Sequence, residues 1–473
     1  MLVALFPRWN LAWLSPVALV PLLMALGRER RAGRRFLLGA VTGWIFWAGT
    51  CYWIYGVLYR HGRMPAAGAA ALFVGFFLLK GLHLGVFAWV AGWSLARAWA
   101  VPAVAAAWVA VEGTHPYAGF TWLMLGNAAT DMALVARLAP LTGVAGMSFA
   151  LAMMSVGLTL ALGRRPRAQL AWLLALPLLY LAPPLPLPSP GRQLAHLVQP
   201  NISEEEVYSL PWTPLRHQRM LRLWETLSTS QRSPDLLLWP ENPAPSYYDI
   251  DPLFRATVEQ IARTQGTFLL FSSITYRDRE TRRQPLNSAV LVGPEGNEMA
   301  RYDKIYLVPF GEFVPWPLGA LVQKVTREAG DFVPGDRVVV ASAGERRIGT
   351  FICYESVYGR GVRRFAAGGA EVLVNLSNDG WFGRSAARQQ HLLIARMRAA
   401  ENGRWLLRAT NSGLTAVIDP AGRVRAALEP DRAGVLAGGF DYSGARTFYT
   451  RWGDWFWWTA VAGALLSYRG RTS

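Results

Sequence analysis

The chain is 473 residues long, 52% of them hydrophobic, and its formal net charge is +17. So much apolar and aromatic surface, including 21 tryptophans, excludes one ordinary soluble domain and predicts at least two domains. The positive charge leaves nucleic acid, an anionic membrane or a membrane-topology signal as explanations. Two cysteines exclude a disulfide framework.

The first part of the chain is typical of a membrane-embedded region. A helix that crosses the bilayer needs about 20 mostly apolar residues. The apolar segments are 10–27, 36–59, 66–96, 100–112, 135–162 and 168–186. We therefore predict a transmembrane region at 1–190 with about six spans, ending in the proline-rich linker 183–190.

Arginines gather in alternate loops between these apolar segments. The basic loops contain the arginines of 28–35, Arg97 and those of 164–167. Because arginine-rich loops stay in the cytoplasm, we expect the N-terminus and the segment after residue 186 to lie outside. Topology then explains much of the charge, and no nucleic-acid partner is expected.

Two ionisable residues, Lys80 and His83, lie three positions apart inside the apolar stretch 66–96. An ionisable group within the bilayer is a functional candidate. Lys80 could equally extend its side chain to the membrane interface. Both interpretations stay open.

After the linker the sequence changes to short apolar runs, typical of strands, with helical patterns between some of them. The predicted strands are 194–199, 236–239, 267–272, 289–293, 348–353 and 372–376, and the predicted helices are 213–228, 252–264 and 391–402. Near-continuous apolar strands indicate a sheet that is buried on both faces. Residues 191–445 are therefore expected to form an α/β domain of ordinary size.

The C-terminal segment 446–473 returns to a membrane pattern. Four tryptophans between 452 and 458 precede an apolar run, which Arg469 and Arg471 follow. Aromatic side chains concentrate at membrane interfaces, and the arginines indicate a cytoplasmic tail. An outside N-terminus and an inside C-terminus need an odd number of crossings, so seven spans are predicted in all.

Three polar residues stand at or near the ends of predicted strands: Glu241, Lys304 and Cys353. Each also has an ordinary interpretation. Glu241 could be a turn residue, Lys304 could be an exposed charge on an edge strand, and Cys353 could simply fill the core, as a lone buried Cys most often does. Only three lysines occur among the 48 basic residues, which makes Lys304 unusual. Together the three residues form a base, a cation that can stabilise an oxyanion, and a nucleophile.

These motifs resemble the nitrilase (carbon–nitrogen hydrolase) superfamily. With the flanking spans, the chain resembles its membrane-embedded branch, the apolipoprotein N-acyltransferase family, over nearly its whole length. The most specific pieces are Trp239-Pro240-Glu241, Asp303-Lys304, Ile352-Cys353-Tyr354-Glu355 and Ser377-Asn378-Asp379-Gly380-Trp381-Phe382-Gly383. The resemblance implies a polytopic α-helical membrane bundle plus an extracytoplasmic α/β nitrilase-like domain, an αββα sandwich. The family usually has eight spans, one more than we predict here.

The resemblance also implies an activity. The sn-1 acyl chain of a phospholipid, such as phosphatidylethanolamine, would pass through a thioester on Cys353 to the N-terminal amine of a diacylglyceryl-cysteine apolipoprotein. Glu241 would act as the base, and Lys304 with a backbone N–H near Cys353 would hold the oxyanion. The resemblance implies no cofactor and no metal. We expect a monomer in the bacterial inner membrane, with its catalytic domain on the periplasmic face.

Further residues are assigned supporting roles. We expect Glu312, Glu355 and Tyr354 to organise Lys304 and the cysteine loop. The candidates for substrate contacts or an apolar lid are Trp239, Phe310, Phe313, Trp381 and Phe382, together with the segment 306–330. The aromatic and proline-rich stretch 314–321 is expected to enter the lipid.

Two other functions use the same features. A membrane-tethered amidase would employ the same three residues on a small amide, with water as the acceptor. Seven spans and an apolar arm at 306–321 argue against it, because a small polar substrate needs neither. A non-catalytic scaffold or transporter is the other alternative, and the intact set of Glu241, Lys304 and Cys353 argues against that.

Overall fold

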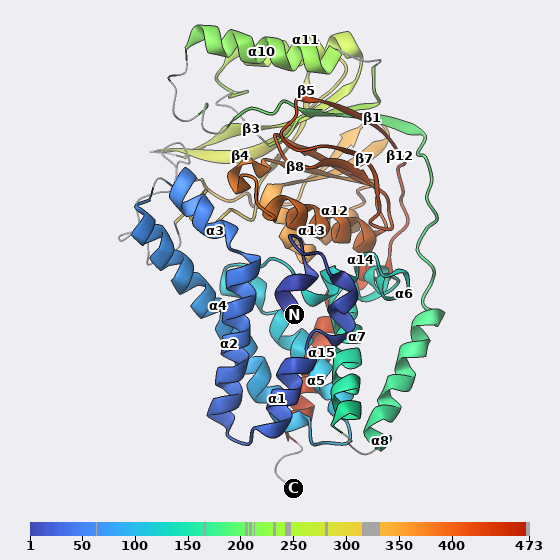
Figure 1. Cartoon of the computed structure of the whole chain (residues 1–473). Helices are drawn as coiled ribbons and strands as arrows, with labels where there is room; N and C mark the ends of the chain where they lie inside the picture. Colours follow the sequence, from blue (N-terminus) through green and yellow to red (C-terminus); the bar gives the residue numbers. More distant parts are fainter. Residues whose placement is uncertain are drawn as a thin grey trace. The chain divides into compact units, whose positions relative to one another are not determined.

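The computed structural model describes residues 1–62, 64–163, 167–203, 207, 211, 213–229, 233–241, 247–279, 282–314 and 332–469. The chain divides into two compact units. A helical unit comprises Met1–Tyr59, Met64–Leu185 and Thr447–Ser473, and a sheet-containing unit comprises Arg60–Arg63 and Pro186–Arg446 (Figure 1).

The helical unit is built from apolar helices. They are α1 (Val20–Arg28), α2 (Ala32–Thr50), α3 (Trp53–Gly56), α4 (Ala66–Ser94), α5 (Ala100–Glu112), α6 (Ala133–Ala136), α7 (Ala139–Leu162), α8 (Arg167–Leu170), α14 (Phe448–Trp452) and α15 (Trp455–Arg469). Helices α2 and α4 pack at backbone distance, since a Cβ on Gly39 would lie 2.2 Å from the Leu84 carbonyl oxygen. Small residues permit such close approach between helices in a membrane.

Two of the described helices, α4 and α7, are long and apolar enough to cross a membrane. A third span is possible if α2 and the segment Trp53–His61, which bends away from it by 51°, count as one. The other expected spans correspond to shorter helices. A proline interrupts the α-helix in two of these segments. Pro16 lies in the 3-10 turn before α1, and Pro177 lies in the 3-10 segment Ala171–Leu181.

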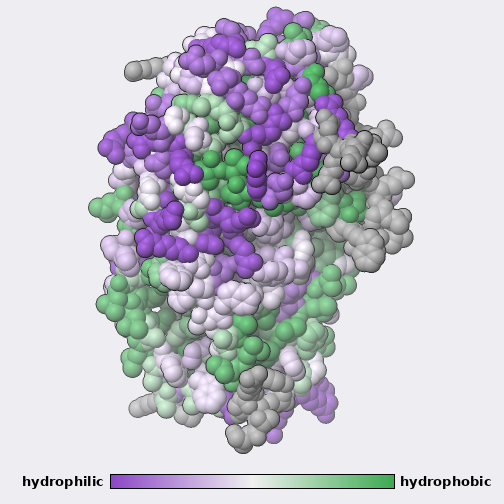
Figure 2. All heavy atoms as spheres, turned by 180° about the vertical axis from the view of Figure 1, so that it is seen from behind, coloured by the Kyte–Doolittle hydropathy of each residue, from purple (hydrophilic) through white to green (hydrophobic). Residues whose placement is uncertain are grey.

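Large apolar side chains remain exposed on the helical unit, including Ile45 and Leu79, whose exposed fractions are 63% and 66%. Figure 2 shows hydrophobic residues gathered over this unit, while hydrophilic residues predominate over the sheet-containing unit. An exposed apolar surface of this kind marks contact with lipid or a partner. With the membrane-length helices, it indicates a membrane protein.

The second unit contains two six-stranded sheets. In spatial order the first sheet is β12 (Gly434–Phe440), β1 (Gln193–Gln199), β2 (Leu236–Leu238), β3 (Phe268–Arg279), β4 (Arg282–Val292) and β5 (Glu298–Asp303). The second is β11 (Val424–Leu428), β10 (Thr415–Ile418), β9 (Leu406–Thr410), β8 (Val372–Ser377), β7 (Arg346–Ile352) and β6 (Val340–Ala343). All six predicted strands are present, as β1, β2, β3, β4, β7 and β8.

Helices cover the outer faces of both sheets. Helices α10 (Pro214–Thr229) and α11 (Pro252–Gln265) lie on the first sheet, and α12 (Gly359–Ala367) and α13 (Ala387–Asn402) lie on the second (Figure 1). The main hydrophobic core lies between the sheets and includes Leu238 and Ile352. The four layers confirm the predicted αββα sandwich.

Candidate active site

Glu241 follows β2, a buried strand that pairs in parallel with β1 and β3. Ligands of α/β folds bind at the carboxyl ends of such strands. The Glu241 side chain is buried, and its Oε1 accepts hydrogen bonds from Lys304 Nζ at 3.1 Å and Asn287 Nδ2 at 2.9 Å. Its Oε2 accepts from the Asn378 N–H at 3.0 Å.

Lys304 follows β5 and is only 1% exposed. Its backbone N–H donates to the Asn287 carbonyl oxygen at 2.8 Å, which directs the side chain toward two carboxylates. Its Nζ lies 3.1 Å from Glu241 Oε1 and 3.0 Å from Glu312 Oε2. Burial alone would lower the pKa of Lys304, but Glu241 and then Glu312 raise it above its ordinary value. The amine is therefore held as a cation.

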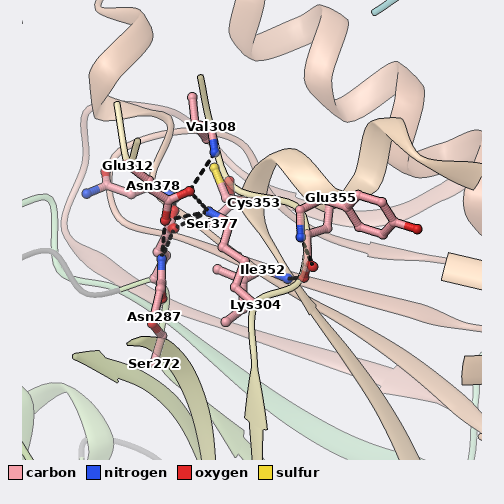
Figure 3. A network of polar contacts seen from close by, with 12 residues as sticks. Ser272, Asn287, Lys304, Val308, Glu312, Ile352, Cys353, Glu355, Ser377 and Asn378 are labelled. Carbon is pink, nitrogen blue, oxygen red and sulfur yellow. Dashed lines mark hydrogen bonds and ion pairs between the residues drawn. The ribbon is translucent and has the colours of Figure 1, made fainter. Parts of the chain in front are cut away.

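Cys353 follows β7 with a backbone φ of +49°, in the left-handed region that a non-glycine residue seldom adopts. Its side chain faces the carboxylate and lysine cluster in Figure 3. Burial and then the negative charge of Glu241 raise the pKa of the thiol, while Lys304 acts in the opposite direction. The resting thiol is therefore protonated, and it needs a proton acceptor before it can react.

Glu355 is a buried carboxylate that organises the backbone around the site. Its Oε1 accepts hydrogen bonds from the Tyr302 hydroxyl at 2.7 Å and from the N–H groups of Ile305 and Tyr306 at 2.8 and 3.1 Å. Its Oε2 accepts from the Ile352 N–H at 2.8 Å. One side chain thus holds both the segment after Lys304 and the residue before Cys353.

Glu312 holds the loop that follows Lys304. Its Oε2 accepts a hydrogen bond from the Val308 N–H at 2.7 Å, and its Oε1 accepts from Asn287 Nδ2 at 2.9 Å. Phe310, in a left-handed conformation with a φ of +64°, closes this loop through its N–H to the Phe313 carbonyl oxygen at 2.7 Å. Both aromatic side chains are half-buried. The expected lipid-entering stretch lies, from residue 315 onward, outside the described residues.

The other aromatic candidates differ in their surroundings. The ring of Trp239 is 1% exposed, stacks on Trp224 with ring centroids 4.3 Å apart and packs in the core with residues of α10 and α11. The indole of Trp381 and the ring of Phe382 are half-buried in the 3-10 turn after β8. Tyr354 packs edge-on against Tyr358 with ring centroids 5.5 Å apart.

Sequence reasoning missed Asn287, which lies in β4 among apolar residues. Its Nδ2 donates to both Glu241 and Glu312, and its Oδ1 accepts from Ser272 Oγ at 3.1 Å. Asn287 therefore keeps the two carboxylates on either side of the lysine. Asn287 precedes the predicted strand 289–293, so no local pattern in the sequence identified it.

Comparisons with known proteins identify the family of the chain. Residues 195–449 match the model of the carbon-nitrogen hydrolase family, and residues 1–157 match that of the apolipoprotein N-acyltransferase N-terminal domain. An amidase from Nesterenkonia sp. is similar in structure, with 22% identity and a TM-score of 0.40, covering 56% of this chain and 94% of its own. The family match over residues 195–449, more than half of the chain, shows that the protein is an enzyme of the carbon-nitrogen hydrolase, or nitrilase, superfamily.

Relatives match almost the whole chain. The apolipoprotein N-acyltransferase of Geobacter metallireducens is 33% identical over 98% of this chain and 91% of its own length. That of Azotobacter vinelandii is 34% identical over 95% of this chain and 88% of its own. The chain belongs to the apolipoprotein N-acyltransferase family.

Proposed function

We propose that the protein transfers an acyl chain from a phospholipid to the N-terminal amine of a diacylglyceryl-cysteine lipoprotein, with Cys353 as the covalent carrier. The observation that carries this proposal is the cluster of Glu241, Lys304 and the Cys353 thiol in one buried site. Membership of the family and the membrane-length helices support lipid substrates.

The first half of the reaction loads the enzyme. Glu241 takes the thiol proton as Cys353 Sγ attacks the carbonyl carbon of the sn-1 ester, which forms a carbon–sulfur bond. Lys304 Nζ and a backbone N–H stabilise the negative oxygen of the tetrahedral intermediate. The ester carbon–oxygen bond then breaks, and the leaving alkoxide takes the proton from Glu241. The products are a lysophospholipid and an acyl thioester on Cys353.

The second half transfers the acyl chain. Glu241 takes a proton from the amine of the lipoprotein as its nitrogen attacks the thioester carbon. A carbon–nitrogen bond forms, the carbon–sulfur bond breaks, and the proton held by Glu241 returns to the thiolate. The same three side chains therefore serve both halves of a ping-pong reaction.

We place the sheet-containing unit on the periplasmic face of the bacterial inner membrane. The arginine pattern of the loops supports this orientation, since the basic loops stay in the cytoplasm. Both substrates carry acyl chains, which makes attachment to the bilayer useful for the catalytic unit.

The decisive experiment supplies the purified protein with phosphatidylethanolamine labelled in the sn-1 chain and a diacylated lipopeptide. We expect labelled triacylated peptide, lysophospholipid, and, without the peptide, an acyl adduct on Cys353 in the intact mass. Cys353→Ala is the control and should give none of these. Turnover of a small amide without labelled peptide would establish the amidase instead, and the absence of both activities would indicate a scaffold.

A further inference from the structure

A second buried polar cluster adjoins Cys353, and the reaction steps above do not use it. It consists of Asp379, His391 and Arg408, whose side chains are fully buried. Arg408 Nη2 donates to Asp379 Oδ1 and Oδ2 at 2.9 and 2.7 Å. The Nδ1 atom of His391 lies 2.9 Å from Asp379 Oδ1 and 2.9 Å from Arg408 Nη2. Three elements, the turn after β8, α13 and β9, supply the three residues.

The imidazole of this cluster contacts the backbone of the nucleophile. His391 Nε2 lies 3.2 Å from the Cys353 carbonyl oxygen and 2.8 Å from Ser356 Oγ. Burial and then the positive charge of Arg408 lower the pKa of His391, so the ring is neutral. We assign the single ring proton to Nε2, where the Cys353 carbonyl oxygen can accept it, because a proton on Nδ1 would face Arg408 Nη2, which is itself a donor, at 2.9 Å. Nδ1 is then the acceptor for Arg408 Nη2.

This contact fixes the direction of a peptide group. The left-handed conformation of Cys353 is strained and persists only where its surroundings enforce it. Because a trans peptide is planar, the N–H of Tyr354 points away from the carbonyl oxygen of Cys353. A bond that holds this oxygen on the His391 side therefore turns the Tyr354 N–H to the opposite side.

We propose that Asp379, His391 and Arg408 form a positioning network that aims the Tyr354 N–H at the oxyanion as the second donor beside Lys304. His391 acts through the Cys353 carbonyl oxygen and touches no substrate. The inference rests on the proposed covalent step at Cys353, but not on the source of the acyl group.

Two reagents that both modify Cys353 separate this role from general damage. p-Nitrophenyl butyrate acylates the thiol through a tetrahedral oxyanion, whereas iodoacetamide alkylates it by direct displacement without one. Two variants form a matched pair. In His391→Asn the amide can still meet Asp379 and Arg408, but it is too short to reach the Cys353 carbonyl oxygen. In His391→Gln the longer amide can reach that oxygen.

We expect His391→Asn to lower the rate of acylation by nitrophenyl butyrate about 100-fold, as loss of an oxyanion donor does. Its alkylation rate should stay within about threefold of the parent protein. His391→Gln should recover most of the acylation rate. His196→Leu, which alters a buried histidine in β1, is the control and should change neither rate by more than about threefold.

An equal loss of acylation and alkylation in His391→Asn would overturn the inference, because it would show damage to the thiol itself. Unchanged acylation, or no recovery in His391→Gln, would overturn it too. If His391→Asn does not fold, the test rests on His391→Gln alone. Equal losses of the acylation and alkylation rates in His391→Gln would contradict the proposal, and a small loss of acylation with unchanged alkylation would support it. A parent protein that reacts with nitrophenyl butyrate but never with phospholipid would refute the proposed function and leave this inference standing.

Discussion

At the scale of single residues, the site is a lysine held between two carboxylates beside a thiol. The Lys304 cation is shared by Glu241 and Glu312 at 3.1 and 3.0 Å, so negative charge predominates around Cys353. Burial, and then the negative charge of Glu241, raises the pKa of the thiol, and the opposing effect of Lys304 does not cancel this. The cysteine therefore rests as a thiol, and in the proposed mechanism its attack is coupled to proton transfer to Glu241.

The substitution Glu241→Gln tests this coupling. It removes the proton acceptor, so acylation of Cys353 by phospholipid should fall by at least about 100-fold. It also removes a charge that raises the pKa of the thiol, so the pH profile of iodoacetamide alkylation should move to lower pH. Alkylation rates measured between pH 6 and about 10 check the direction. A profile that moved to higher pH would contradict the electrostatic account.

The substitution Lys304→Arg tests the shape of the cation rather than its charge. The planar guanidinium of arginine does not reproduce a compact ammonium that points at one oxygen. We expect acyl-adduct formation to fall by about 100-fold or more, while alkylation of Cys353 continues. The intact mass after incubation with phosphatidylethanolamine gives the measurement. Near-normal acylation in this variant would remove Lys304 from the oxyanion role.

The sequence indicated the residues around Cys353 unequally. Glu241, Lys304 and Cys353 stand at or near the ends of apolar runs, where a polar residue is conspicuous. His391 is not conspicuous, because its partners Asp379 and Arg408 lie 12 and 17 positions away and meet it only in the folded sheet. The position of Trp239 two residues before Glu241 predicts a substrate contact, whereas the structure shows its ring packed in a hydrophobic core with Trp224 and Phe254, which the sequence did not indicate.

At the scale of elements, Glu355 joins two strand ends that are far apart in sequence. Its carboxylate receives four hydrogen bonds, three from the segment 302–306 that spans the end of β5 and one from the end of β7. Burial raises the pKa of Glu355 despite these donors. The element that supplies the lysine and the one that supplies the cysteine are thus tied through a single side chain.

We expect Glu355→Ala to destabilise the sheet-containing unit by about 3 kcal/mol, because buried donors lose their acceptor. The thermal unfolding midpoint should fall by roughly 5–10 °C, measured by scanning calorimetry of the detergent-solubilised protein. Glu345→Ala, which alters an exposed carboxylate in the β6–β7 turn, is the control and should shift the midpoint by less than about 2 °C. Equal midpoints for the two variants would refute the structural role of Glu355.

The elements that sequence reasoning missed share a physical cause. Strand β9 contains the buried Arg408, which interrupts its apolar pattern, and β11 is half-exposed with Arg425 as its second residue. The pairing of both strands depends on neighbours from elsewhere in the chain, which local sequence does not show. Conversely, prolines inside apolar runs were underestimated as helix breakers in the membrane region, at Pro16 and Pro177.

At the scale of the whole molecule, the orientation in the membrane can be measured by cysteine labelling. Both native cysteines are buried, so background reaction is low. Arg222→Cys places a thiol on the exposed face of α10, and Arg31→Cys places one in the loop between α1 and α2. With a membrane-impermeant maleimide on intact spheroplasts, we expect Arg222→Cys to react at once and Arg31→Cys to react only after lysis. The reverse pattern would invert the proposed topology.

The close contact of α2 with α4 at Gly39 and Gly43 limits how these helices can move. A methyl group at Gly39 or Gly43 would meet backbone atoms of α4 at 2.2 and 2.5 Å, so at these two positions the main chains of the two helices approach each other closely. Helices joined in this way cannot slide or rotate past each other without a collision of their main chains. We therefore expect α2 and α4 to move together as one rigid body. Any bending of this part of the bundle should occur at the 51° bend between α2 and α3.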